Sequence, residues 1–169
     1  KLKDRGDVVV GPDYGRLASG EFGLGRLSPT EEIISEIKTR VGKIYGDLIG
    51  KHIVITAGGT REPMDPVRFL GNRSSGKMGY AIAEAARDRG SEVTLISSAN
   101  RPTIAGVNII NTETTADMFK KVQEATKNAD ALIMAAAVSD FRFKNIKENK
   151  IKNKNSDIDV SLTPNPDIV

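Results

Sequence analysis

The stretch Ile53-Val54-Ile55-Thr56-Ala57-Gly58-Gly59-Thr60 decides the fold class. A short run of β-branched residues that ends in a glycine turn is typical of a buried strand followed by a ligand-binding loop. Further apolar runs predict strands over residues 92–97, 107–111 and 131–138, and helical spacing predicts helices over 77–88 and 115–127. This alternation predicts a three-layer, Rossmann-like α/β fold, in which a mainly parallel, doubly wound sheet carries helices on both faces.

The chain on either side of this pattern is less regular. Residues 1–26 are rich in glycine and lack periodicity, so we expect a loop there. The tetrapeptide Ser28-Pro29-Thr30-Glu31 predicts a helix start, with its serine as the N-cap and its glutamate completing a capping box. This helix is expected to end near Gly46. Its apolar stripe consists of Ile33, Ile34, Ile37, Val41 and Ile44. We also expect an irregular stretch over 61–71 and an alternating strand around 159–162.

Composition excludes several classes of protein. The 169 residues are enough for one α/β domain with a short appendage, and 38% hydrophobic with 28% charged residues is typical of a globular chain. A net charge of +3 is too small to indicate nucleic-acid binding. The longest apolar run, 131–138, is too short to cross a membrane, and no signal peptide opens the chain. With no cysteine and one histidine, we predict no thiolate or histidine metal site and a cytoplasmic location.

The glycine turn after the first strand is a candidate phosphate site. Gly58 and Gly59 would let backbone amides approach a phosphate closely. The G-x-G-x-x-G fingerprint of dinucleotide-binding folds is absent, which weakens a nicotinamide interpretation. The alternative is a plain tight turn.

The segment Gly71-Asn72-Arg73-Ser74-Ser75-Gly76-Lys77-Met78 nearly matches a Walker A loop. Methionine stands where serine or threonine should hold magnesium, and no strand directly precedes the segment, so we reject a P-loop NTPase. Ser74 and Gly76 still lie at a predicted helix start, which attracts anions, although Ser74 could serve only as an N-cap. The Asn72 amide could donate to a developing oxyanion or could be a turn residue.

Asp140 follows the fourth strand, where a carboxylate is well placed to accept hydrogen bonds from ribose hydroxyls. The small alanines before it would let a base or sugar lie against the backbone. A turn or capping aspartate is the alternative. A basic segment then contains Lys144, Lys147, Lys150, Lys152 and Lys154. It is either a solvated loop or a flap over an anionic ligand.

Taken together, these stretches resemble phosphopantothenate–cysteine ligase over nearly all of residues 51–169. Four blocks of sequence carry the resemblance. They are Thr56-Ala57-Gly58-Gly59-Thr60-Arg61-Glu62-Pro63 with Asp65-Pro66-Val67-Arg68, Asn72-Arg73-Ser74-Ser75-Gly76-Lys77-Met78-Gly79, Ala135-Ala136-Ala137-Val138-Ser139-Asp140-Phe141-Arg142, and Lys150-Ile151-Lys152 with Asn165-Pro166-Asp167-Ile168-Val169. Each block is modest alone, but all four in this order are highly specific.

The upstream part resembles the C-terminal end of the flavin-dependent phosphopantothenoylcysteine decarboxylase, which in many microbes precedes the ligase in one chain. Gly15-Arg16-Leu17-Ala18-Ser19-Gly20 and Gly23-Leu24-Gly25-Arg26 carry this resemblance. The family has a catalytic cysteine where this chain has Ser19, and a hydroxyl cannot replace thiol chemistry. We therefore expect no decarboxylase activity and no bound FMN. The implied domains are a decarboxylase remnant with a linker helix over 1–49 and a nucleotide-binding ligase domain over 50–169.

The resemblance implies a reaction in two steps. The carboxylate of 4'-phosphopantothenate attacks the α-phosphate of CTP, with ATP as the alternative, and the amine of L-cysteine then attacks the acyl-nucleotide. It also implies Mg²⁺ on the triphosphate, no protein-held metal and a homodimer. Catalytic roles fall to Asn72 and Lys150, and substrate contacts to Asn72, Arg68 and Ala137. The nucleotide-binding residues would be Gly58, Gly59, Ser74, Gly76 and Gly79 around the phosphates, Lys150 beside them, Asp140 on ribose, and Met134, Ala135, Ala136, Pro166, Asp167, Ile168 and Val169 around the base.

Two other functions stay open. The ligase family continues past Val169 with residues that hold the triphosphate, so the chain could be a truncated nucleotide-binding or dimerisation module without activity. A Rossmann-type NAD(P)-dependent oxidoreductase is the other alternative. The missing glycine fingerprint and the lack of a Tyr-x-x-x-Lys pair count against the oxidoreductase.

Overall fold

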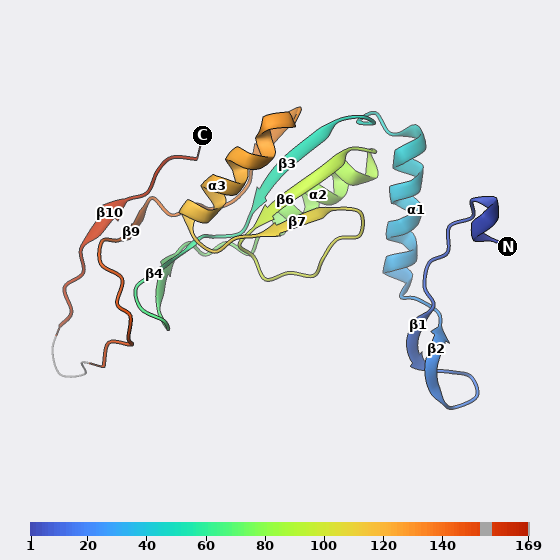
Figure 1. Cartoon of the computed structure of the whole chain (residues 1–169), viewed down its shortest axis with the longest axis horizontal. Helices are drawn as coiled ribbons and strands as arrows, with labels where there is room; N and C mark the ends of the chain where they lie inside the picture. Colours follow the sequence, from blue (N-terminus) through green and yellow to red (C-terminus); the bar gives the residue numbers. More distant parts are fainter. Residues whose placement is uncertain (153–156, 169) are drawn as a thin grey trace.

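The computed structural model describes residues 1–152 and 157–168 (Figure 1). Its centre is a sheet of four parallel strands in the order β7-β6-β3-β8. The strands are β3 (His52–Ala57), β6 (Glu92–Ser97), β7 (Asn108–Asn111) and β8 (Ala131–Met134). The chain adds β6 and then β7 on one side of β3 and afterwards places β8 on its other side, so the sheet is doubly wound, as predicted.

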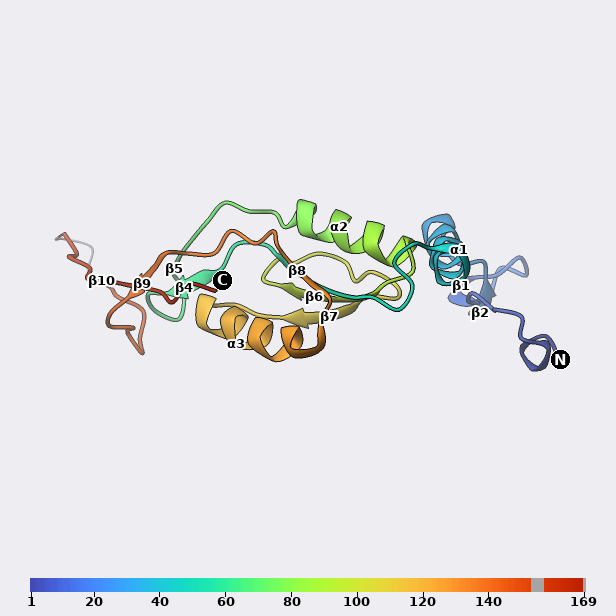
Figure 2. The same ribbon diagram turned by 90° about the horizontal axis from the view of Figure 1, so that it is seen from above.

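One helix covers each face of this sheet. Figure 2 shows α2 (Lys77–Asp88) on one side and α3 (Thr115–Ala125) on the other. Alternate residues of β3 point into the two layers, with Ile55 in the cluster beneath α2 and Val54 in the cluster beneath α3. A short 3₁₀ turn, η2 (Thr126–Asn128), ends the second helix. The three-layer α/β prediction is therefore confirmed. No helix among the described residues is long and apolar enough to cross a membrane.

The fourth strand is shorter than predicted. β8 ends at Met134 rather than at residue 138. The backbone amides of Ala135 and Ala136 both donate to the Thr56 hydroxyl at 3.1 Å, so the chain leaves the ladder there. Ala137 then pairs with Gly59 in an isolated bridge. A single hydroxyl on the neighbouring strand thus converts the end of a strand into a loop.

Two small antiparallel ribbons form an arm at the carboxyl end of the sheet (Figure 1). The stretch 61–71, predicted to be irregular, contains β4 (Arg61–Pro63) paired with β5 (Phe69–Gly71). The second ribbon pairs β9 (Phe141–Phe143) with β10 (Leu162–Pro164). The strand expected around 159–162 therefore begins at Leu162, because its register is set by residues 141–143.

The N-terminal region is more ordered than predicted. After a short turn, η1 (Lys3–Arg5), the supposed loop contains the hairpin β1 (Asp13–Arg16) and β2 (Phe22–Arg26). Helix α1 (Thr30–Tyr45) follows and ends at Gly46, as expected. The predicted capping box was wrong: Pro29 is the N-cap, and the Ser28 hydroxyl donates to Asp13 Oδ1 at 2.9 Å. Tertiary contact with the hairpin thus takes the hydroxyl that would have capped the helix.

Helix α1 packs on α2 through small residues rather than through its apolar stripe. A Cβ added to Gly42 would lie 2.4 Å from the carbonyl oxygen of Asp88, so the two backbones touch. Most of the stripe is exposed to solvent, with Ile37 56% and Ile44 65% exposed. Periodicity therefore predicted the helix but not the face that it buries.

Helix α2 approaches β3 equally closely at Gly79. A Cβ there would lie 2.6 Å from Ala57 Cβ and 2.7 Å from the Thr56 carbonyl oxygen. We expect Gly79→Val to lower the free energy of unfolding by about 3 kcal/mol, because the helix must move off the strand. Urea unfolding measures this. The control is Ala81→Val, an exposed site on the same helix, expected to cost about 0.5 kcal/mol. Equal losses in the two variants would contradict this packing role.

Candidate functional site

The glycine turn after β3 is packed against two other loops. Gly58 has φ 90°, and a Cβ there would lie 2.6 Å from Ala99 N. A Cβ on Gly59 would lie 2.5 Å from the Asn72 carbonyl oxygen. Side chains at either position would push these loops apart. The turn is therefore both tight and closely approached by neighbouring backbone, at the end of the sheet where ligands of such folds bind.

An arginine-lined pocket of about 600 Å³ opens beside this turn. It is lined by Gly59, Arg61, Phe69, Asn72, Arg73, Ser74, Ser75, Ser98, Ala99, Asn100 and Arg101. Arg61 stacks over the Phe69 ring and Arg101 over the Tyr80 ring, each at 5.3 Å from the ring centroid. Arg101 Nε is buried without a hydrogen-bond partner in the described part of the chain. The pocket thus concentrates positive charge, and one of its buried N–H donors has no acceptor among the described residues.

The N-terminus of α2 adjoins the arginine-lined pocket. Its N-cap is Gly76, with φ 72° and no side-chain cap. Ser74 is therefore not the N-cap; its hydroxyl instead accepts a long bond, 3.4 Å, from the Gly76 amide. The first amides of the helix, including that of Gly79, have no acceptor within the helix. Together with the dipole, these donors favour an anion at this end of the sheet.

A second pocket, of about 260 Å³, lies between the loop after β8 and the chain after β10. We call it the carboxylate-lined pocket. It is lined by Met134, Val138, Ser139, Asp140, Asn165, Pro166, Asp167 and Ile168. Asn165 ties the two walls together: its amide donates to the Asp140 carbonyl and its side chain to the Ser139 carbonyl, both at 2.8 Å. Five residues predicted to bind nucleotide thus meet here, while Val169 lies outside the described residues.

Asn72 joins the two pockets. Its Nδ2 donates to the Val138 carbonyl at 2.9 Å and to the Ala137 carbonyl at 3.3 Å, while the residue lines the arginine-lined pocket. Nδ2 therefore already has two acceptors. Donation to a substrate oxygen requires release of one contact, and the longer bond is the weaker one.

Comparison with known proteins now identifies the family. The sequence profile of the DNA/pantothenate metabolism flavoprotein C-terminal domain matches residues 48–169. The chain belongs to this family. The resemblance seen in the sequence is thereby confirmed at the level of the family.

Several relatives of this chain share the name coenzyme A biosynthesis bifunctional protein CoaBC. The protein from Mycobacterium tuberculosis (strain ATCC 25618 / H37Rv) is 44% identical over 156 residues, or 89% of this chain. That from Haemophilus influenzae is 42% identical over 169 residues, or 99% of this chain. The chain spans only 37% and 42% of the lengths of these two relatives. A solved C-terminal domain of CoaBC superposes with a TM-score of 0.62 at 42% identity, covering 72% of this chain and 57% of that domain.

The sequence did not predict a buried polar network that adjoins the candidate site. Glu62, 2% exposed, accepts from both the amide and the hydroxyl of Thr115 at 2.8 Å. The Thr115 hydroxyl also contacts that of Thr60 at 3.0 Å, and Thr60 accepts from the Ser139 amide at 2.8 Å. This network holds the loop that ends at Asp140. No spacing in the sequence predicts this network, because its members come from β4, α3 and two separate loops.

Two other predicted residues, Arg68 and Lys150, line neither pocket and lie on the arm. The Arg68 guanidinium pairs with Asp65, whose side chain is fully buried. The hydrogen bond from Arg68 holds the pKa of the Asp65 carboxyl well below its ordinary value of 3.8, against the opposing effect of burial. Because the pKa is lowered on folding, the stabilisation is complete above pH 4 and is lost as pH falls through the folded value. The pair is therefore intact at neutral pH.

Proposed function

We propose that this chain forms the nucleotide-binding part of a phosphopantothenate–cysteine ligase of coenzyme A biosynthesis. The observation that carries the proposal is the arrangement of two chemically different pockets, joined by Asn72, at the carboxyl end of a parallel sheet. The family and the names of its relatives support the same pathway. The sequence alone suggested the residues. In the structure, those that line the two pockets lie at one end of the sheet.

The arginine-lined pocket suits the phosphates of a nucleoside triphosphate. Arg61, Arg73 and Arg101 supply positive charge and planar arrays of N–H donors, which match phosphate oxygens. The free amides at the start of α2 add uncharged donors. No group of three or more histidine, cysteine or acidic side chains that could hold a metal occurs in the described ranges. As the resemblance implies, Mg²⁺ would bind to the triphosphate.

The carboxylate-lined pocket suits the sugar and base. Asp140 would accept from the ribose hydroxyls, and the backbone of Met134, Ala135 and Ala136 would face the base together with residues 166–168. Since the amides of Ala135 and Ala136 already donate to Thr56, base recognition by these two residues would use their carbonyl groups. Carbonyl acceptors match an exocyclic amine, which cytosine and adenine share.

The chemistry needs no protein nucleophile. The phosphopantothenate carboxylate oxygen attacks the α-phosphorus of CTP, a P–O bond forms, and pyrophosphate leaves with its magnesium. The cysteine amine then attacks the acyl carbon, an amide bond forms, CMP leaves, and the amine proton passes to solvent. The protein contributes orientation and charge stabilisation. Asn72 would donate to the acyl oxygen, and Lys150 would approach the phosphate side from the arm.

Asp140→Ala tests the proposal through binding. We expect wild-type chain to bind CTP in the presence of Mg²⁺, and the variant to bind it about 10- to 100-fold more weakly, because hydrogen bonds to a charged acceptor are lost. Isothermal titration with CTP and with ATP measures both. The control is Asp47→Ala, an exposed carboxylate at the opposite end of the sheet.

Three results would count against the assignment in different ways. An unchanged CTP affinity in Asp140→Ala would remove the ribose role, and weaker phosphopantothenate binding would then assign the carboxylate to that substrate instead. Failure of wild type to bind either nucleotide would contradict nucleotide binding. Tight binding of NAD(P) would favour the oxidoreductase.

A nucleotide-binding module without activity is the second candidate. The observation in its favour is that Lys150, predicted to be catalytic, lines neither pocket. Saturable CTP binding with no pyrophosphate release in the presence of phosphopantothenate would select it. Release of pyrophosphate, followed by CMP only when cysteine is added, would select the ligase.

A further inference from the structure

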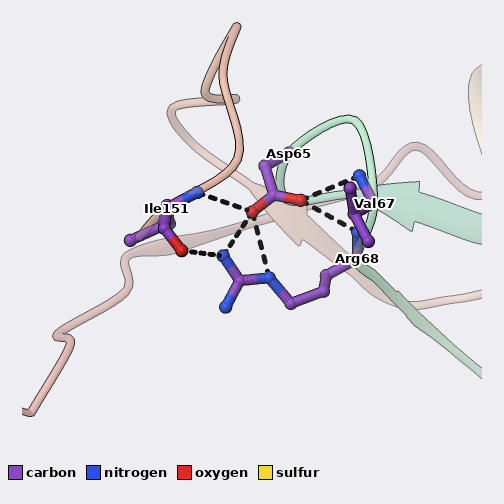
Figure 3. A network of polar contacts seen from close by, with 4 residues as sticks. All are labelled: Asp65, Val67, Arg68 and Ile151. Atoms are coloured by element: carbon purple, nitrogen blue, oxygen red, sulfur yellow. Dashed lines mark hydrogen bonds and ion pairs between the residues drawn. The ribbon is translucent and has the colours of Figure 1, made fainter. Parts of the chain in front are cut away.

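We infer that Asp65 is a positioning residue that, together with Arg68, locks the backbone behind Lys150 in place. Figure 3 shows the contacts. Asp65 lies in the turn of the β4–β5 hairpin, and Ile151 lies in the basic segment more than eighty positions further along the chain. The catalytic consequence of this inference rests on the proposed function, because that function gives Lys150 its role.

The two oxygens of Asp65 have separate tasks. Oδ1 accepts from the amides of Val67 and Arg68, both at 2.9 Å, and so closes the turn. Oδ2 accepts from Arg68 Nε at 3.0 Å, from Arg68 Nη2, and from the Ile151 amide at 3.2 Å. One oxygen thus builds the hairpin turn, and the other ties a distant segment to it.

Arg68 completes the attachment from the other side. Its Nη2 also donates to the Ile151 carbonyl at 3.2 Å. Both backbone polar groups of Ile151 are therefore held by one ion pair, whose carboxylate is fully buried. A residue bound at both its N–H and its C=O cannot rotate freely, so the direction in which the preceding residue, Lys150, leaves the arm is also restricted.

A second contact anchors the same segment. The Lys147 amide donates to the Met64 carbonyl at 3.0 Å, one residue before Asp65 in the hairpin turn. Residues 147–151 are thus attached at both ends to the turn over 64–68. The Lys150 side chain remains exposed. This is the arrangement expected for a cation that must reach an anionic ligand from a fixed backbone position.

The other function of Arg68, contact with substrate, is compatible with this arrangement. Nε and Nη2 are used by Asp65 and Ile151, and Nη1 has no partner among residues 1–152 and 157–168. A ligand could take up Nη1 without breaking the attachment. The ion pair therefore also orients the free edge of the guanidinium.

Asp65→Asn separates the two tasks of the carboxylate. The amide oxygen can still accept from Val67 and Arg68, but an NH₂ group now faces the guanidinium and the Ile151 amide and cannot accept from either. The matched control is Asp47→Asn, which removes the carboxylate partner of Arg89, an exposed arginine remote from the arm. Both variants lose one charged partner of an arginine, and only one of them releases Ile151.

Amide exchange measures the attachment without reference to activity. On the whole chain labelled with ¹⁵N-isoleucine, we expect exchange of the Ile151 amide to accelerate about tenfold or more in Asp65→Asn, as local opening becomes easier. Exchange of the Ile55 amide in the central strand should stay unchanged. Asp47→Asn should leave both amides unchanged. Equal Ile151 exchange in wild type and Asp65→Asn would overturn the inference, whatever the protein does catalytically.

Kinetics then tests the positioning role. If ligation is observed, kcat in Asp65→Asn should fall about 10- to 100-fold while KM for CTP stays within threefold, because Lys150 is displaced but the nucleotide pockets are not. The melting temperature of Asp65→Asn should lie below that of the control because a buried charged partner is lost, so the rates are compared well below both unfolding transitions. Faster Ile151 exchange with unchanged kcat would overturn the positioning role while leaving the attachment established. A chain that binds nucleotide but makes no product in wild type would count against the proposed function, and the exchange result would still decide the attachment.

Discussion

Asn72→Ala is expected to lower the rate of product formation about 100- to 1,000-fold, the range found when one oxyanion donor is removed. In this chain the loss has two sources. The variant lacks the amide that would donate to the acyl oxygen. It also lacks the bond to the Val138 carbonyl, which joins the arginine-lined pocket to the loop after β8. Single-turnover assays that follow pyrophosphate and acyl-cytidylate would measure the effect.

Asn72→Asp removes the donor, as Asn72→Ala does, and adds repulsion, because its carboxylate oxygens would face the carbonyls of Ala137 and Val138. A larger loss in Asn72→Asp than in Asn72→Ala would therefore measure the contribution of the junction between the pockets. The control is Asn100→Ala, which lines the same pocket and forms no such bridge. Rates within threefold of wild type in both Asn72 variants would exclude the residue from the chemistry.

Lys150→Gln is expected to lower kcat to a similar extent, about 100-fold or more, because preorganised positive charge near a transferring phosphoryl group is lost. CTP affinity should change less than threefold, since Lys150 lines neither nucleotide pocket. Kinetics combined with titration of CTP separates the two effects.

Lys147→Gln is the matched control for this lysine. Lys147 lies in the same basic segment, and its backbone attachment to Met64 does not involve the side chain. Equal losses of kcat in the two glutamine variants would show that the segment contributes only its overall positive charge. A large loss of CTP affinity in Lys150→Gln alone would show that Lys150 contacts the bound nucleotide.

The central fold was predictable because each element had a local signal. The β-branched run of β3, the alanine-rich α2 and the glycine after it are patterns that neighbouring residues produce by themselves. The ribbons were not predictable in this way. A three-residue strand such as β4, which ends in Pro63, has no periodicity to detect and forms only because β5 lies opposite. The early end of β8 depends on the Thr56 side chain, which belongs to another strand.

Some residues of the candidate site were likewise predictable from local motifs, and others were not. Asp140 and residues 166–168 were proposed from motifs, and they line one pocket. Glu62 and Arg101 were not proposed, because their importance depends on burial and on neighbours distant in sequence. The partner of Arg68 was present in the quoted motif, yet only the structure connects the pair to Ile151. The assigned roles in binding and catalysis stay predictions.

The closure of the carboxylate-lined pocket by residues 165–168 has a consequence for synthesis. The ribosome makes β3, α2 and the glycine turn long before Asn165, so the sheet can begin to form while one wall of the pocket does not yet exist. A nascent chain can therefore form the glycine turn and the start of α2 before it has both walls of this pocket. A ligand that contacts both walls of this pocket can therefore bind only after Ile168 has left the exit tunnel.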